Sequence, residues 1–247
     1  YEQYRQASDL PVANNDEART HLASVAVRLT PTPTPIPTGT PPPTLPPTEV
    51  PTPLPLTAYR NQIVFLSDDE EQPGYWVMNP DGSNRRYLGR SRALDKEYQA
   101  LVEAARYSPD GRYYAFVRRA GRVDQIFVLL PQDPSSGQQA SEQITDLSRL
   151  CYDPVWAPDG SRIAFVSQQD DSDDIWIVYP DGSQPQNLTE NRALWDKHPS
   201  WSPDSLRIVF WSNRTGQKQI FVMDADGRNQ RNSSNTARDE YDPIWIR

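Results

Sequence analysis

The stretch VWAPDGSRIAFVS, residues 155–167, decides the fold, because similar strings occur twice more in the chain. These strings read RYSPDGRYYAFVR at 106–118 and SWSPDSLRIVFWS at 200–212. In each, a large aromatic residue precedes a turn that begins with Pro-Asp, and a β-branched and aromatic segment follows the turn. We predict buried strands in these segments, at 113–117, 163–166 and 208–211, and a further one at 63–66.

A second repeated string predicts the next strand of each unit and the hairpin turn after it. IWIVYPDGS at 175–183 recurs as YWVMNPDGS at 75–83 and IFVMDADGR at 220–228, and IFVLLPQD at 126–133 is a degenerate copy. A short polar strand that often ends in Leu-Thr completes the unit. Four antiparallel strands at a spacing of 45 to 49 residues are typical of one blade of a β-propeller.

The number of blades follows from the copies of each strand. Strands two to four of the unit occur four times, whereas a first strand is expected only before Tyr107, Trp156 and Trp201. The missing copy stands at the end of the chain, where YDPIW at 241–245 matches YDPVW at 152–156. We therefore predict an all-β, four-bladed propeller that is closed by the C-terminal strand, which removes a free sheet edge.

The repeat resembles the TolB-type, WD-repeat-like β-propeller repeat, whose pattern is close to P-x-W-S-P-D-G-x-x-I-A-F followed by I-Y-V-M-N-A-D-G-S. The resemblance covers residues 59–247 and implies an extracytoplasmic protein that binds another protein or a cell-wall partner. This chain departs from the pattern where Ser205 replaces the turn glycine and where 131–143 replaces a turn. The resemblance therefore implies no particular partner.

A proline-rich tract precedes the repeats and divides the chain into three parts. Twelve of the 25 prolines lie between 31 and 55, and proline excludes helix and sheet interiors. We expect an N-terminal extension at 1–29, a stiff polyproline II stalk at 30–57 that spans up to ~80 Å, and the propeller at 58–247. Alternating Thr-Pro is also typical of O-glycosylated stalks, so the tract is either a bare linker or a carrier of sugars on Thr32, Thr34, Thr38, Thr40, Thr44, Thr48 and Thr52.

The N-terminal extension contains one short apolar segment. Leu22, Val25, Val27 and Leu29 indicate a strand, and a lone strand is not stable in water. The segment is therefore disordered, folds back along a bent linker, or adds to a sheet of another molecule. Because the stalk is stiff, the third outcome would join copies head to tail, and such contacts form filaments when they do not close.

Composition excludes several classes of function. The net charge of −8 opposes nucleic-acid binding, and no apolar run reaches the ~18 residues of a membrane span. A single cysteine, Cys151, rules out an intrachain disulfide, and we expect it to be a buried small residue. No G-x-S-x-G, P-loop, dinucleotide or H-E-x-x-H motif occurs. We expect no catalytic residues and no cofactor, with His198 as a neutral polar residue near the central channel.

A few residues outside the repeat pattern remain candidates for binding or modification. The acidic loop offers weak calcium ligands at Asp170, Asp171, Asp173 and Asp174, although no glycine follows where a calcium loop needs one. Asn-x-Ser/Thr sequons at Asn187, Asn213 and Asn232 are candidate glycosylation sites. Trp195 and Trp211 are candidate contact or sugar-stacking residues. Apolar spacing over 94–105 predicts a surface helix between the first two blades.

Two functions fit this organisation, and a third requires a catalytic domain outside this chain. The first is a non-enzymatic extracellular or cell-surface protein that self-assembles into a fibre or surface layer through Leu22 to Leu29. The alternative is a TolB-like periplasmic or surface module that binds a protein or a glycan through one propeller face. The third is a sensor or accessory domain of a larger enzyme.

Self-assembly is tested by removing the N-terminal segment. We expect deletion of residues 1–30 to abolish assembly, because the deletion removes the strand that would join two copies. Sedimentation velocity and electron microscopy of full-length and truncated protein measure this. Full-length protein that stays monomeric at high concentration would contradict the prediction.

Overall fold

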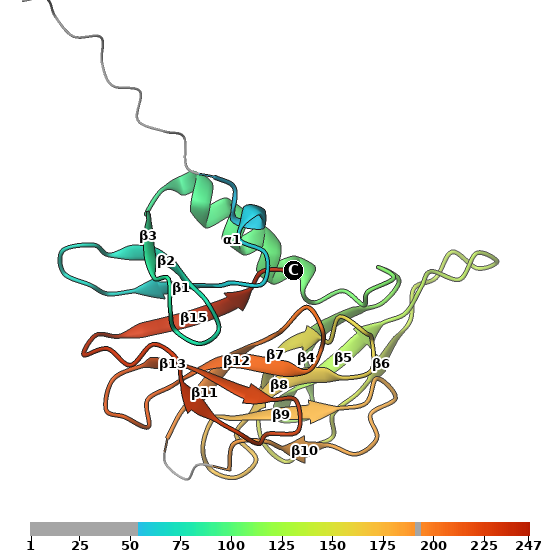
Figure 1. Ribbon diagram of the computed structural model, residues 1–247. Helices are drawn as coiled ribbons and strands as arrows, with labels where there is room; N and C mark the ends of the chain where they lie inside the picture. The colour runs from blue at the N-terminus through green and yellow to red at the C-terminus, as the bar shows by residue number, and fades with distance from the viewer. Residues whose placement is uncertain (1–53, 191–193) are drawn as a thin grey trace, which may run out of the picture. The chain divides into compact units, whose positions relative to one another are not determined.

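Four antiparallel β-sheets contain the repeats (Figure 1). The computed structural model describes residues 54–190 and 194–247. The sequence predictions for Leu22 to Leu29 and for the threonines of the stalk lie outside these residues. Each sheet is one blade, and we number the blades in chain order.

Three blades have four strands and one has three. Blade 1 has the strand order β15 (Glu240–Trp245), β1 (Ile63–Ser67), β2 (Gly74–Met78) and β3 (Arg86–Gly89). Blade 2 has β4 (Tyr114–Ala120), β5 (Val123–Leu129) and β6 (Ser141–Gln143). Blade 3 has β7 (Cys151–Trp156), β8 (Ile163–Ser167), β9 (Asp174–Val178) and β10 (Gln186–Asn187). Blade 4 has β11 (Asp196–Trp201), β12 (Arg207–Ser212), β13 (Gln219–Asp224) and β14 (Arg231–Asn232).

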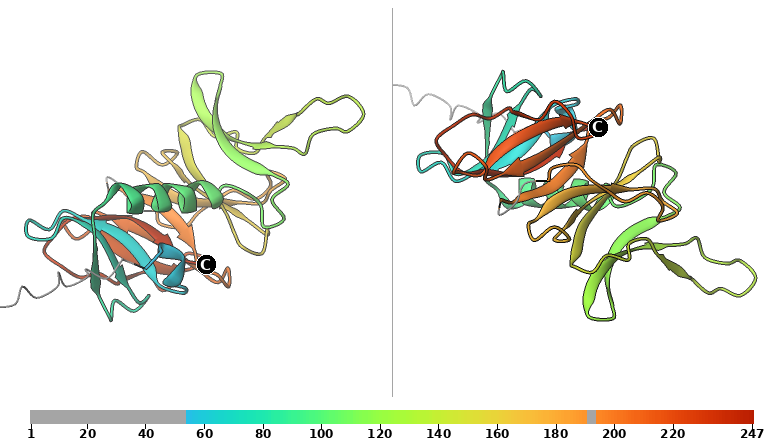
Figure 2. Two further views of the ribbon diagram at one scale, coloured as in Figure 1. Left: turned by 90° about the horizontal axis from the view of Figure 1, so that it is seen from above. Right: turned by 90° about the horizontal axis from the view of Figure 1, so that it is seen from below.

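The central strands of blades 3 and 4 are buried on both faces because each of these two sheets packs between two other sheets. In β8, Phe165 packs against blade 2, in a cluster that includes Ala115. Ala164, which points to the opposite face of β8, packs in a cluster with Phe210 of blade 4. Blade 4 packs against blade 1 in the same way. The four sheets therefore succeed one another in the order 2, 3, 4, 1 (Figure 2).

The C-terminal strand completes the first blade, as the sequence predicts. β15 pairs antiparallel with β1, and Trp245 lies opposite Ile63. The four-bladed, all-β prediction is thereby confirmed. The ends of the repeat region are joined by a full strand ladder rather than by a loop.

The inner strand expected before Tyr107 is absent from blade 2, and a helix stands in its place. Helix α1 spans Arg92–Ala104, and the Ser91 hydroxyl caps it by accepting a hydrogen bond from the Leu94 N–H at 3.2 Å. Only an isolated bridge between Tyr107 and Tyr114 remains of the strand. The predicted surface helix is present. Its apolar residues are spaced so that a helix buries them on one face, whereas a strand would leave half of them exposed. The helical spacing therefore prevails over the repeat pattern here.

Helix α1 covers the face of blade 1 that no sheet covers. Leu94 and Tyr98 are buried in a cluster with Val64 and Val77 of blade 1. The Tyr98 hydroxyl donates a hydrogen bond to the backbone carbonyl of Asp242 in β15 at 2.8 Å. The 3-10 helix η1 (Leu56–Ala58) adds Leu56 to the same cluster. Across the part of the chain that the structure describes, no helix is long and apolar enough to span a membrane.

The closure by β15 can be tested at its most buried side chain. Trp245 is 2% exposed and packs between blades 1 and 4. We expect Trp245→Ala to lower the free energy of unfolding by ~3–5 kcal/mol, because it leaves a cavity at the join. Urea denaturation measures this change.

The matched control is Trp195→Ala, which removes a tryptophan that is 49% exposed. We expect that change to stay within about 0.5 kcal/mol. Equal effects of the two substitutions would show that β15 does not hold the blades together.

Candidate functional site

The inner strands of blades 3, 4 and 1 share a bulge that turns one polar side chain toward a common point. The pairing of β7 with β8, β11 with β12 and β15 with β1 shifts register at equivalent positions. Asp153, His198 and Asp242 stand there with φ of 51°, 53° and 51°, and each precedes a proline. A bulge of this kind re-aims a side chain without ending the strand.

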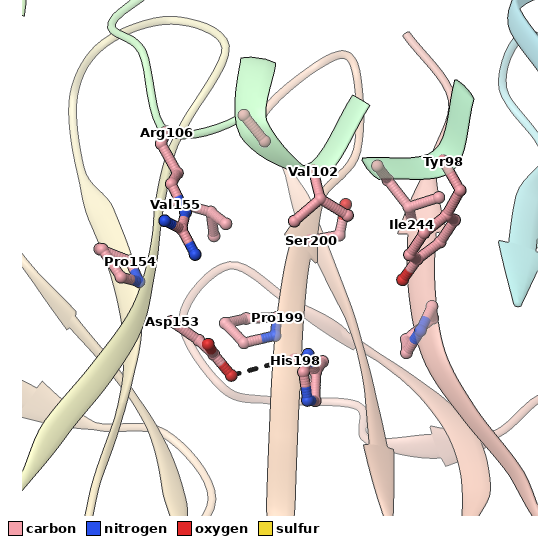
Figure 3. A pocket seen from close by; sticks show the side chains of 12 residues that line it. Tyr98, Val102, Arg106, Asp153, Pro154, Val155, His198, Pro199, Ser200 and Ile244 are labelled. Atoms are coloured by element: carbon pink, nitrogen blue, oxygen red, sulfur yellow. Dashed lines mark ion pairs between the residues drawn. The ribbon is translucent and has the colours of Figure 1, made fainter. Parts of the chain in front are cut away.

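His198 lies between Asp153 and Asp242, and Figure 3 shows its contact with Asp153. The His198 Nδ1 lies 3.6 Å from Oδ2 of Asp153, and its Nε2 lies 3.3 Å from Oδ1 of Asp242. The imidazole also stacks on Trp211, with 6.5 Å between ring centroids and 20° between ring planes. All three polar side chains keep between 27% and 42% of their surface exposed, so a partner can reach them.

Helix α1 lines the pocket around these residues. Tyr98, Val102 and Arg106 come from the helix and the two residues that follow it, and Val155 and Ile244 come from the inner strands (Figure 3). The enclosed volume is about 50 Å³. This volume holds one or two water molecules or the tip of a side chain, and it is far below the ~300–1,000 Å³ of small-molecule sites.

Burial and neighbouring charges set the protonation of the site. Burial raises the pKa of Asp242 above its ordinary value of 3.8, the charge on His198 opposes this rise, and the charge on Asp153 adds to it. Burial also raises the pKa of Tyr98, which keeps its hydroxyl protonated as a donor. The hydroxyl of Ser200, which also lines the pocket, accepts a hydrogen bond from the Trp245 N–H at 3.0 Å. The arrangement can therefore bind a polar group. The Ser200 hydroxyl already accepts a hydrogen bond from the backbone of β15.

The weak calcium candidates bind partners from the chain itself. Asp170 accepts from Asn187, and Asp171 pairs with Arg149 at 2.7 Å. Asp173 accepts from the Tyr152 hydroxyl at 2.8 Å and pairs with Lys197 at 3.0 Å. Asp174 accepts from Asn187, Ser172 and Thr189. Within 54–190 and 194–247, no three acidic, histidine or cysteine side chains gather in a geometry that could hold a metal ion.

Two of the three sequon asparagines, Asn187 and Asn232, form side-chain turns. Asn187 accepts a hydrogen bond from the Thr189 N–H at 3.0 Å, and Asn232 accepts one from the Ser234 N–H at 3.1 Å. Asn213 accepts from the backbone N–H of Trp195. The sequon spacing therefore coincides with a side-chain turn at the end of a strand, and glycosylation at these residues stays a prediction.

Cys151 and the two extra tryptophans have different environments. Cys151 is fully buried, and burial raises the pKa of its thiol, so it is a poor nucleophile. Trp211 is 5% exposed and packs between blades 4 and 1, so it is part of the core and not a sugar-stacking surface. Trp195 is half exposed and remains available for contact.

Sequence reasoning found part of this site. The matching strings YDP, KHP and YDP align His198 with Asp153 and Asp242. The pattern does not reveal that Tyr98 and Arg106 line the pocket, because the repeat predicts a strand where α1 stands. The helical spacing of 94–105 is the only sequence signal for the helix, and it does not say which blade the helix packs against.

The fold and the site define a β-propeller of TolB-type repeats with a polar group at the inner strands. The TolB beta propeller domain family model matches residues 56–246, so the chain belongs to this family. A protein TolB homolog of Protochlamydia amoebophila is 26% identical over 139 residues, which cover 55% of this chain and 29% of the relative. A Tol-Pal system protein TolB of Anaeromyxobacter dehalogenans is 28% identical over 125 residues, which cover 49% and 26%. The match thus spans less than a third of these relatives.

Two solved structures match part of this chain, each with a TM-score below 0.5. A putative TolB from Agrobacterium tumefaciens has a TM-score of 0.45 and 20% identity, and the match covers 72% of this chain and 69% of that chain. A puromycin hydrolase S511A mutant has a TM-score of 0.44 and 14% identity, and the match covers 76% and 31%.

The protonation of Asp242 gives a test of the site geometry. A folded-state pKa above 3.8 means that the native state binds this proton before the unfolded state does. The charged Asp242 therefore destabilises the fold at neutral pH, and this penalty is relieved as the pH falls through the raised pKa. Carbon-detected NMR titration of the carboxyl groups should place the pKa of Asp242 above 3.8.

Two variants separate the causes of that shift. We expect His198→Ala to raise the pKa of Asp242 further, because it removes the positive neighbour, and Asp153→Asn to lower it. Asp204 serves as the control. Its pKa is lowered by a hydrogen bond from the Ser202 hydroxyl in a different turn, so neither variant should change the pKa of Asp204. An Asp242 that titrates at or below 3.8 in the unmodified protein would show that the described packing around it is wrong.

Proposed function

We propose that the chain is an extracytoplasmic, TolB-like binding module that acts without catalysis and recognises another protein through its inner-strand face. The observation that carries this proposal is the convergence of Asp153, His198 and Asp242 from three blades. In each, a positive φ at a bulge turns the side chain inward. We assign the module to the periplasm, in line with the family resemblance.

The size of the pocket favours a protein partner over a small substrate. A volume of about 50 Å³ admits the tip of one side chain. Polar groups that lie among apolar walls, here Val102, Val155 and Ile244, match the usual make-up of an interface hot spot. A side chain that donates hydrogen bonds to Asp153 and stacks near His198 would use both features.

Charge supports the same type of partner. The chain carries a net charge of −8, and opposite charge on a partner speeds association and favours correct pairing. A basic or neutral protein surface therefore fits this module better than an acidic one.

Self-assembly into a fibre or layer and glycosylation of the stalk stay predictions from the sequence. The segment Leu22 to Leu29 and the stalk threonines lie outside the described residues, so no described contact supports either. A glycan partner is an alternative for the exposed Trp195, which offers one aromatic face.

Affinity capture from a cell-envelope extract of the source organism tests the proposal. We expect the immobilised chain to retain a specific protein, and His198→Ala to weaken that binding at least about tenfold, the effect of ~1.4 kcal/mol. A chain that lacks residues 1–53 should bind as well as the full chain.

Leu206→Ala is the matched control, because Leu206 is 66% exposed on a turn and takes no part in the pocket. Equal retention by His198→Ala and by the unmodified chain would remove the inner-strand face as the binding surface. Loss of binding with residues 1–53 would move the interaction to the N-terminal extension.

A further inference from the structure

A second cavity lies between blades 2 and 3, on residues that the His198 site does not use. Its volume is about 560 Å³, which is within the range of sites for small ligands and single side chains. Tyr113, Trp156, Val128 and Leu130 supply aromatic and apolar walls. Four carboxylates line the same cavity: Asp110, Glu142, Asp159 and Asp181. No Lys or Arg is among its lining residues.

The internal repeat shows what this cavity lacks. In the equivalent cavity between blades 4 and 1, Asp204, Arg207 and Trp245 are lining residues. The guanidinium of Arg207 lies 4.9 Å from the centroid of the Trp245 ring. The chain therefore supplies its own cation to the tryptophan at that junction, in the geometry of a cation–π contact.

The residue that aligns with Arg207 in blade 2 is Tyr113. In the repeat strings, Trp156 matches Trp245, and the turn residue Asp110 matches Asp204. Tyr113 lies 6.4 Å from Trp156, ring centroid to ring centroid. The cavity between blades 2 and 3 thus keeps the tryptophan and the carboxylate of the other junction and lacks its guanidinium.

Turn hydrogen bonds lower the pKa of two of the four carboxylates, those of Asp110 and Asp181. The Ser108 hydroxyl donates to Asp110 at 2.6 Å and lowers the pKa of that carboxyl. The hydroxyl and N–H of Ser183 lower the pKa of Asp181 in the same way. Among the described residues, none of the four carboxylates has an ion-pair partner within 4.0 Å.

Two arginines lie near the cavity without entering it. The guanidinium of Arg112 lies 5.8 Å from the ring centroid of Tyr113, and Arg112 itself is exposed. The guanidinium of Arg247 donates a hydrogen bond to the Trp156 backbone carbonyl at 2.9 Å. The Trp156 side chain is 4% exposed, and its indole Nε1 has no hydrogen-bond partner within the described residues. The Trp245 Nε1 at the other junction also has no hydrogen-bond partner within the described residues, so the tryptophan would offer a cation its ring face and not its N–H, which is itself a donor.

We propose that this cavity binds the guanidinium or ammonium group of a basic side chain that belongs to a protein partner. The cation would occupy the place that Arg207 has at the other junction, between the tryptophan and the turn carboxylates. The proposal does not depend on the His198 site, because the two cavities share no lining residue.

The probe is the peptide acetyl-Gly-Arg-Gly-amide, titrated into the full chain by isothermal calorimetry at low and high salt. We expect saturable binding that weakens as salt rises, because the contact is between charges. The lysine peptide should also bind, and the citrulline peptide, which has the same shape without the charge, should not. Free arginine forms a separate arm: tighter binding of free arginine than of the peptide would assign the cavity to a free amino acid instead.

The decisive variant is Tyr113→Arg, which supplies the guanidinium that blade 4 has. We expect it to weaken peptide binding at least tenfold by filling the cavity from within. Asp110→Asn removes one carboxylate and should weaken binding by a smaller factor without new bulk. Thermal unfolding of both variants checks that they fold. If Tyr113→Arg does not fold, Asp110→Asn still tests the proposal.

Two controls fix the location of the effect. Asp204→Asn makes the matched change at the junction of blades 4 and 1 and should leave peptide affinity unchanged. His198→Ala should also leave it unchanged, which separates this site from the proposed protein-binding face. No saturable binding of the arginine peptide, or equal binding by Tyr113→Arg and the unmodified chain, would overturn the proposal.

Discussion

The whole structure depends on one constraint, which is that each β-sheet is apolar on both faces and must be covered on both. In blades 3, 4 and 1 an aromatic pair that spans two strands packs toward the preceding blade in the order 2, 3, 4, 1, as Phe165 and Trp176 do against blade 2. The smaller residues of the opposite face, such as Ala164, receive the aromatic pair of the next blade. Large residues against small ones fill the space between the sheets, and this packing sets their order.

The constraint also explains the two places where the repeat is broken. Blade 1 has no sheet against its second face, and α1 covers Val64 and Val77 there. Blade 2 has no preceding sheet, and the guanidinium of Arg118 lies 3.8 Å from the ring centroid of Phe127 on that side. Helix α1 and Arg118 thus cover surface that a neighbouring blade covers elsewhere. The two departures from the repeat occur at the two sheets that lack a neighbouring blade on one face.

Both proposed binding sites lie at positions where one copy of the repeat differs from another. His198 stands where the other inner strands have aspartate, which puts a base between two acids. Tyr113 stands where blade 4 has Arg207, so no Lys or Arg lines that cavity. The backbone φ is 51° to 53° at Asp153, His198 and Asp242 alike, so a substitution at such a position changes the chemistry of the site while the bulge is kept. This pattern is in line with function residing in sites on a common scaffold.

The sequence by itself determined the number of blades, the strand-turn-strand order, the pairing of the C-terminal strand with the first blade and the alignment of His198 with Asp153 and Asp242. These features are local or repeated, so turn residues and strand patterns are enough to predict them. Only the tertiary structure decided that α1 replaces the inner strand of blade 2, that Tyr98 closes over Asp242, and that Trp211 is core while Trp195 is exposed. The reason is physical. A periodic pattern predicts that one face of a helix or strand is buried, but the element that covers this face is set by contacts between residues far apart in the chain.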